Sequence, residues 1–176
     1  MSIITGRGDS GDTDLLFGKR IAKSSLRIEA LGNVDELNAA LGLARAAASN
    51  PAWIALIDTL QERLIGLMGQ LAYLPEDHAL YVEKKYAAIT QADLDWVTAQ
   101  AHQYEAQGIK FTGWARPGAE GSIARAAIDF SRAVARRAER AVLILHESGE
   151  PVPKVVRLYF NRLSDLLWIL ARVASE

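Results

Sequence analysis

The stretch WIALIDTLQERLIGLMGQLAYL, residues 53–74, carries the clearest structural pattern of the chain. Its large apolar residues return every three or four positions, which places them on one face of an α-helix. The pattern therefore predicts an amphipathic helix that runs from Trp53 to about Leu74 and is closed by Pro75. The residues that make its apolar face are Trp53, Leu56, Ile57, Leu60, Leu64, Ile65, Leu67, Met68 and Leu71.

Four further helices are expected around this one. The first begins after Asn33, because Asn33 and Glu36 read as an N-cap pair ahead of an apolar face, and it ends before residue 51. Residues 75–89 show no clear pattern. The third helix along the chain is capped at Thr90 and covers residues 90–108. The fourth and fifth expected helices cover residues 122–146 and 154–173.

These elements predict an all-α fold. Strand-like alternation is essentially absent, and five helices with short connections favour an antiparallel bundle. The chain has 176 residues, of which 50% are hydrophobic, enough for one domain with its own core. We expect a glycine-rich arm over residues 1–32 and a single five-helix antiparallel bundle over residues 33–176.

Composition excludes several classes of function. Lys and Arg total 20 and Asp and Glu total 21, so the net charge of -1 favours neither nucleic acid nor an anionic membrane as a partner. The absence of cysteine excludes disulfides, thiolate metal sites and cysteine nucleophiles. The first residues of the chain resemble no signal peptide, and the apolar runs of the chain are too short to span a bilayer. A cytoplasmic protein without a membrane or nucleic-acid partner is expected.

The segment SRAVARRAER, residues 131–140, concentrates arginines on one face of the helix expected there. Arg132, Arg136, Glu139 and Arg140 share this face, with Arg137 on the adjoining flank. Like charges four residues apart repel, so such a face favours binding of an anion such as phosphate. The alternative interpretation is a solvated basic stripe paired with acidic neighbouring helices.

The arm contains a second candidate anion site in TGRGDSGDT, residues 5–13. Glycines alternate there with hydroxyl and carboxylate residues, and such loops can direct successive N–H groups at phosphate. Asp9 and Asp12 could hold a magnesium ion. The spacing is not that of a phosphate-binding P-loop, and a flexible tail remains the alternative.

A third polar motif, NRLSDLLWILAR, residues 161–172, lies in the last expected helix. Asn161 and Asp165 stand four residues apart on an otherwise apolar segment, either as site residues or as the polar face of an ordinary amphipathic helix.

These motifs occur in order, together with RIAK at 20–23 and RIEALGNVDELN at 27–38. In this combination the chain resembles the PduO-type ATP:cob(I)alamin (corrinoid) adenosyltransferases. The similarity covers both ends and the 122–146 helix, and it rests on helical character alone over residues 50–110. The resemblance implies a homotrimer that binds ATP at subunit interfaces, binds cobalamin, and transfers the 5′-adenosyl group of ATP to cobalt. It also allows a reductase or a cobalamin-dependent enzyme as a further partner.

The resemblance also implies roles for individual residues. Arg132, Arg136 and Trp114 would be the catalytic residues, and Asp9 and Glu139 would be ligands of Mg²⁺. Cobalamin would contact Trp114, Asp35 and Asn38, while Asp35 would also pair with Arg132 across the subunit boundary. The residues implied to bind ATP are Thr5, Gly6, Arg7, Gly8, Asp9, Gly11, Thr13, Lys23, Arg132, Arg136, Arg137, Glu139 and Asn161.

The sequence departs from the family pattern at two places. Trp114 and Ala119 stand where the family usually has phenylalanine and a second glycine. Asp129, Phe130 and Ser131 replace part of a Leu-His-x-Ala stretch. These departures concern the corrin contacts more than the ATP contacts, and they favour one alternative function, a non-catalytic nucleotide- or corrinoid-binding bundle that acts as a carrier or sensor. A second alternative is a helical adaptor whose arginine face binds an acidic protein.

Overall fold

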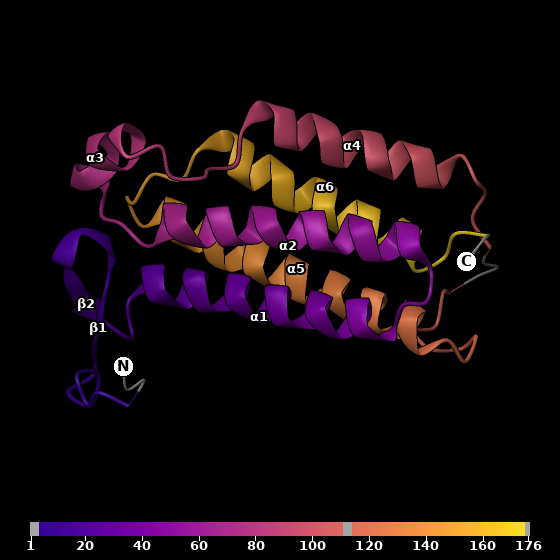
Figure 1. Ribbon diagram of the computed structural model, residues 1–176, viewed down its shortest axis with the longest axis horizontal. Helices are drawn as coiled ribbons and strands as arrows, with labels where there is room; N and C mark the ends of the chain where they lie inside the picture. The colour runs from indigo at the N-terminus through magenta and orange to yellow at the C-terminus, as the bar shows by residue number, and fades with distance from the viewer. Residues whose placement is uncertain (1–3, 111–113, 175–176) are drawn as a thin grey trace.

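The computed structural model describes residues 4–110 and 114–174, and helices dominate it (Figure 1). The mostly helical fold expected from the sequence is confirmed. Between the second and third long helices lie two short ones, η2 (Pro75–Asp77) and α3 (His78–Glu83). The long helices are α1 (Leu26–Ala47), α2 (Pro51–Leu71), α4 (Gln91–Glu105), α5 (Ile123–Glu147) and α6 (Lys154–Leu170).

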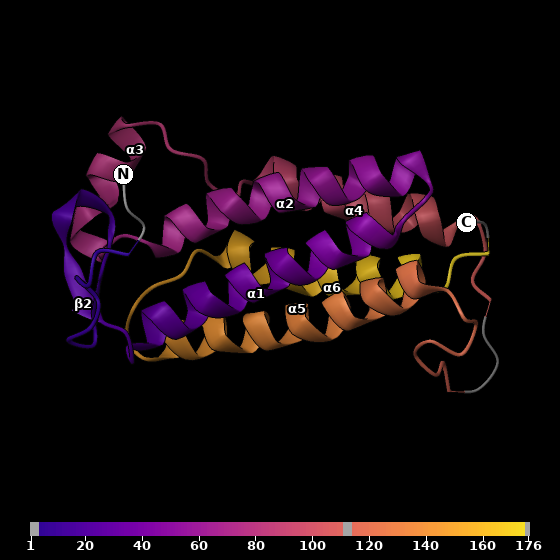
Figure 2. The ribbon, with the colours of Figure 1, turned by 60° about the horizontal axis from the view of Figure 1, so that its bottom comes forward.

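The long helices lie side by side along the long axis of the molecule (Figures 1 and 2). α1 packs against α2 and α5, and α6 lies between α5 and α4. The contacting pairs run antiparallel except α4 and α6, whose C-terminal ends meet where Ile109 pairs with Val173. The expectation of antiparallel packing throughout is therefore wrong for α4 and α6. These helices point the same way because one helix, α5, separates them along the chain.

The apolar face predicted for residues 53–74 forms much of the core. Trp53 is almost fully buried, as are the leucines of this stripe. Ile65 is the exception, with 58% of its surface exposed. α2 begins at Pro51 because the side chain of Asn50 accepts a hydrogen bond from the Ala52 N–H at 2.8 Å, and proline is well suited to the first helical position.

α1 begins earlier than the sequence pattern predicted. Ser25 is its N-cap and accepts a hydrogen bond from the Ile28 N–H at 3.4 Å. Asn33 lies inside the helix, and its side-chain amide donates to the Glu29 carbonyl oxygen at 2.8 Å. The expected cap at Asn33 is wrong because an asparagine can satisfy its amide on the preceding turn of a continuing helix.

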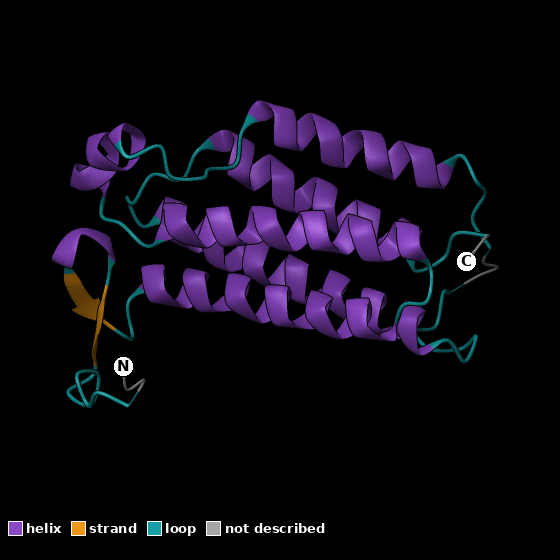
Figure 3. Cartoon of the chain, in the orientation of Figure 1, coloured by secondary structure: helices purple, strands orange, loops and turns teal. Residues whose placement is uncertain are grey.

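The segment before α1 contains a small hairpin that the sequence did not predict (Figure 3). β1 (Asp12–Asp14) pairs antiparallel with β2 (Arg20–Ala22), with Thr13 opposite Ile21. The turn between them, η1 (Leu16–Gly18), has positive φ at Phe17 (61°) and Gly18 (73°). Three-residue strands are too short for alternation to be visible, so the expected absence of strands is wrong here.

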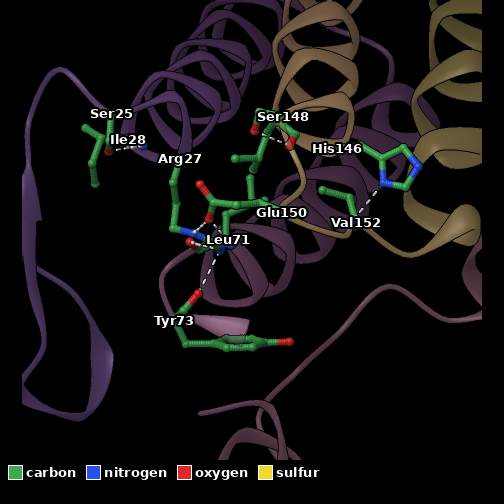
Figure 4. Close-up of polar contacts among 10 residues, drawn as sticks. Ser25, Arg27, Ile28, Leu71, Tyr73, His146, Ser148, Glu150 and Val152 are labelled. Atoms are coloured by element: carbon green, nitrogen blue, oxygen red, sulfur yellow. Dashed lines mark hydrogen bonds and ion pairs between the residues drawn. The ribbon is translucent and has the colours of Figure 1, made fainter. Parts of the chain in front are cut away.

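A buried arginine fixes the start of α1 to the rest of the molecule (Figure 4). The guanidinium of Arg27 donates to Glu150 Oε2 at 2.7 Å and to the carbonyl oxygens of Leu71 and Tyr73 at 3.1 and 2.7 Å. Arg27 therefore joins the base of the arm to the end of α2 and to the α5–α6 connection. Within the described residues, no helix is both long and apolar enough to cross a membrane.

Candidate functional site

The glycine-rich loop of the arm is folded into two consecutive tight turns. The Asp9 N–H donates to the Gly6 carbonyl oxygen and the Gly11 N–H donates to that of Gly8, each at 3.2 Å. Gly6 and Gly11 have φ values of 68° and 92°, which side-chain-bearing residues rarely adopt. The glycines at these two positions are therefore required by the backbone conformation.

Lys23, the residue directly after β2, closes this loop. Its N–H donates to the Gly11 carbonyl oxygen at 2.8 Å. A Cβ built at Gly8 would lie 2.8 Å from Lys23 Nζ, so any larger residue at Gly8 would displace the ammonium group. The structure thus places Gly6, Gly8, Asp9, Gly11 and Lys23 in one loop region, and an ammonium beside a glycine-rich loop suits phosphate oxygens.

The other predicted residues of the arm lie beside this loop. Thr5 Oγ1 accepts a hydrogen bond from the Arg7 N–H at 3.5 Å, and Arg7 forms an ion pair with Asp14 at 3.2 Å. Thr13 lies in β1.

Three contacts attach the tip of the arm to the helices. The Leu16 N–H donates to the Ala72 carbonyl oxygen at 2.7 Å, and Lys19 forms an ion pair with Glu76 at 3.6 Å. The ring of Phe17 stacks on Tyr86 with centroids 6.2 Å apart. The hairpin is therefore anchored at the end of α2 and beside α3.

The arginines of α5 differ in their surroundings. Arg137 forms an ion pair with Glu36 of α1. Arg136 and Arg140 lie exposed one turn apart, and neither side chain has a hydrogen bond or ion pair with any residue among 4–110 and 114–174. The face predicted to bind an anion thus carries two guanidinium groups without a described acidic partner.

Arg132 belongs to a buried ion cluster that the motif did not reveal. Its Nε donates to Asp129 Oδ1 at 2.6 Å, while Arg172 Nη1 and Nη2 donate to the two oxygens of Asp129 at 3.1 and 3.0 Å. The Asp129 side chain is only 3% exposed. Burial alone would raise the pKa of Asp129, but hydrogen bonds from Arg172 and Arg132 outweigh it and hold the pKa below its usual value.

Asp129 and Arg172 are the site residues that sequence reasoning missed. Asp129 was noted only as a departure from the family pattern, and Arg172 only as the last residue of a motif. The spacing of Asp129 and Arg132, three residues apart in one helix, was the available signal. The contact with Arg172 joins helices far apart in sequence and could not be read from spacing.

A cavity of about 680 Å³ lies between the α4–α5 loop, the first turns of α5 and the end of α6. Trp114 lines it and is 99% exposed. Residues 114–121 form the loop that the sequence predicted, while residues 111–113 lie outside the described part of the chain. Asp129 and Arg172 line the floor of the cavity, so the ion cluster and Trp114 share one site.

Within one chain the predicted site is divided. The arm lies at one end of the long axis and the loop at 114–122 lies at the other (Figures 1 and 2). In the described residues, the α5 arginines form ion pairs with Glu36 of α1, Asp129 of α5 and Glu120 of the α4–α5 loop, none of them in the arm. Arg132 binds Asp129 of its own helix rather than Asp35, and the side chains of Asp35 and Asn161 are exposed.

The two carboxylates predicted to hold magnesium are on different elements, Asp9 in the arm and Glu139 in α5. Among residues 4–110 and 114–174, no group of three or more His, Asp or Glu side chains is placed to hold a metal ion. Magnesium commonly keeps one or two protein carboxylates and takes its remaining ligands from phosphates and water, so single carboxylates fit that ion bound together with a nucleotide.

Comparison with known proteins identifies close relatives. The model of the family described as cobalamin adenosyltransferase matches residues 3–174. A cobalamin adenosyltransferase of Cupriavidus metallidurans is 40% identical over 175 residues, which are 99% of this chain and 88% of that protein. Corrinoid adenosyltransferase PduO of Citrobacter freundii is 35% identical over 179 residues, and the chain spans 50% of its length.

A solved structure agrees with this result. It is that of a variant PduO-type ATP:corrinoid adenosyltransferase from Lactobacillus reuteri complexed with cobalamin and ATP. Its TM-score is 0.82 at 26% identity, with 97% of this chain and 92% of that chain covered.

Proposed function

The chain belongs to the cobalamin adenosyltransferase family, and from this premise we propose that it transfers the 5′-adenosyl group of ATP to the cobalt of cob(I)alamin. The products are adenosylcobalamin and triphosphate. The observation that carries the proposal is the pair of exposed arginines on α5, Arg136 and Arg140, which have no acidic partner among the described residues. Two such cations on one face fit the polyphosphate of a nucleotide.

We propose that the five long helices form one bundle, that this bundle assembles as a homotrimer, and that ATP lies between neighbouring subunits. The arm of one subunit would supply the Gly8–Lys23 cradle, and α5 of the next would supply the arginines. Among the described residues no ion pair joins the arm to the α5 arginines, which supports a site shared between subunits. The exposed apolar side chains of Leu43 on α1 and of Phe130 and Ile144 on α5 support the burial of this face in an assembly.

The reaction needs no covalent nucleophile from the protein. Cob(I)alamin, the reduced form of the corrinoid, attacks the 5′ carbon of the ribose with the electron pair of cobalt, the C5′–O bond breaks, and triphosphate leaves with that bond's electrons. Arg132, Arg136 and Lys23 stabilise the negative charge that grows on the leaving triphosphate. The protein otherwise aligns cobalt with carbon and excludes water.

Trp114 is proposed to cover the lower face of cobalt. Its indole is large and apolar and cannot coordinate the metal, so it fills the volume that the lower ligand and water would otherwise occupy. Without a lower ligand, reduction of cobalt to Co(I) is less unfavourable. Asp35 and Asn38 are proposed as further corrin contacts.

The remaining partners complete the proposal. Mg²⁺ held by Asp9 and Glu139 together with the phosphates would offset part of the triphosphate charge. Thr5, Gly6, Arg7, Gly11, Thr13, Arg137 and Asn161 are proposed to complete the nucleotide site. A reductase would supply the electron to cobalt, and the cytoplasm is the proposed compartment.

An anaerobic assay with ATP and chemically reduced cobalamin tests this function. We expect adenosylcobalamin to accumulate, measured by its absorbance and by chromatography, with one triphosphate released per product. Tight binding of both substrates without any product would instead identify the protein as a carrier or sensor. A matched reaction without protein reports the background.

A further inference from the structure

The cavity beside Trp114 is lined by more positive than negative side chains. Its cationic groups are Lys110, Arg116, Arg125 and Arg172, and its carboxylates are Glu120 and Asp129. A pocket with this balance attracts an anionic group.

Both carboxylates are already engaged by arginines. Arg125 Nε lies 3.7 Å from Glu120 Oε2, and the same guanidinium donates to the Ala171 carbonyl oxygen at 3.2 Å. Asp129 binds Arg172 through two hydrogen bonds and also accepts one from Arg132. Neither carboxylate is left to neutralise the remaining cations.

Lys110 and Arg116 are these remaining cations. Both are exposed, and neither forms an ion pair with a residue in the described part of the chain. They stand on either side of Trp114 in the sequence and line the same cavity. Deeper in, Arg172 Nε is buried without a hydrogen-bond partner in the described residues. The cavity therefore presents unsatisfied positive charge around the indole.

We propose that Lys110 and Arg116 bind the phosphodiester in the nucleotide tail of the corrinoid, an inference that rests on the proposed function. The base of this tail is the lower ligand of cobalt, and Trp114 occupies that lower face. The tail must then leave the metal and lie beside the indole, where its phosphodiester is the one anionic group it carries. The flanking cations hold it there and oppose its return to cobalt.

The triphosphate of ATP is the other source of phosphate oxygens. We assign it to the arm and to Arg136 and Arg140, which lie outside the lining of this cavity. The two sources differ in a testable way, because cobinamide lacks the nucleotide tail and its phosphodiester but keeps the corrin ring and cobalt.

The test uses the full chain with Lys110 and Arg116 both replaced by glutamine. Steady-state kinetics with saturating ATP are measured for reduced cobalamin and for reduced cobinamide. We expect KM for cobalamin to rise about threefold to tenfold, as for loss of two partly exposed charge contacts, while KM for cobinamide and KM for ATP stay unchanged. The charge-retaining pair Lys110→Arg and Arg116→Lys should restore KM, and Lys84→Gln, directly after α3 and far from the cavity, should have no effect.

Two outcomes would overturn the proposal. An equal rise of KM for both corrinoids would mean that the cations act on the corrin ring or on the loop itself, and a rise confined to KM for ATP would assign them to the triphosphate. Failure of the proposed function can be told apart from failure of this proposal, because the unmodified protein would then be inactive with both corrinoids.

Discussion

Arg132 and Arg136 lie one turn apart on α5 but have different surroundings, and both are proposed to contact ATP. Arg136 is exposed with no described partner, so its removal leaves no buried charge. Removal of Arg132 leaves Asp129 still bound to Arg172. We expect Arg136→Ala and Arg132→Ala each to lower kcat about tenfold or more with the fold intact. Near-normal turnover in both, with unchanged circular dichroism, would restore the interpretation of a solvated basic stripe.

Trp114 can be tested at the level of cobalt coordination. With the indole removed in Trp114→Ala, a lower ligand or water can return to cobalt, and reduction to Co(I) becomes harder. We expect turnover with a biological reductant to fall while the ATP affinity stays nearly unchanged. The electronic spectrum of bound cob(II)alamin with ATP reports the coordination directly. Identical spectra for the two proteins would mean that Trp114 does not cover the metal.

Asp129 makes a charge-dependent contribution to stability. In Asp129→Asn the buried guanidinium of Arg172 loses its anionic partner, so we expect a loss of about 3 kcal/mol in the free energy of unfolding at pH 7. The pKa of Asp129 is lower in the folded than in the unfolded chain, so its contribution is present above the unfolded value of about 3.9 and is lost as pH falls through the folded pKa. The difference in the free energy of unfolding between the unmodified protein and Asp129→Asn, measured by urea denaturation, should therefore become smaller below about pH 4. A constant difference across this range would show that the charge is not responsible.

At the scale of elements, the sequence predicted best where a local signal fixes the structure. The cap at Thr90 is present as a reciprocal pair of hydrogen bonds with Asp93, and Ser122 caps α5. The helix start predicted at Asn33 is wrong because an asparagine side chain can also be accommodated inside a helix. Ser25 is the N-cap of α1. The hairpin of the arm depends on a turn at Phe17 and Gly18 and on docking against α2 and α3, which no periodicity records.

The arm should respond to nucleotide as a unit. Its loop is exposed, and phosphate would hydrogen-bond N–H groups and the Lys23 ammonium that otherwise face water. We expect ATP with magnesium to raise the melting temperature and to protect residues 5–23 from limited proteolysis. Adenosine, which lacks phosphates, is the matched control and should protect weakly. Equal cleavage with and without saturating ATP would remove the arm from the nucleotide site.

At the scale of the whole molecule, the motifs predicted candidate site residues but not how one chain distributes them. The glycines, Lys23 and the α5 arginines could be proposed from sequence because each motif is local. The docking of the hairpin beside the end of α2, a contact between Leu16 and Ala72 across a long sequence interval, places the arm at the opposite end of the molecule from the loop at 114–122. The ion cluster of Asp129 was missed for the same reason, since it is closed by Arg172 from another helix.

A shared site predicts recovery of activity between two strongly impaired variants. Lys23→Ala damages every arm and Arg136→Ala damages every α5, so each variant alone has no intact site if ATP lies between subunits. In randomly mixed trimers, about one site in four combines an intact arm from one subunit with an intact α5 from its neighbour. We therefore expect coexpression of the two variants to restore about a quarter of the unmodified activity. As a control, a chain carrying both substitutions is coexpressed with the unmodified chain, and activity should again be about a quarter. If arm and α5 of the same chain formed the site, the first mixture would remain inactive and the control would retain about half of the activity, because only the unmodified chains would then carry intact sites.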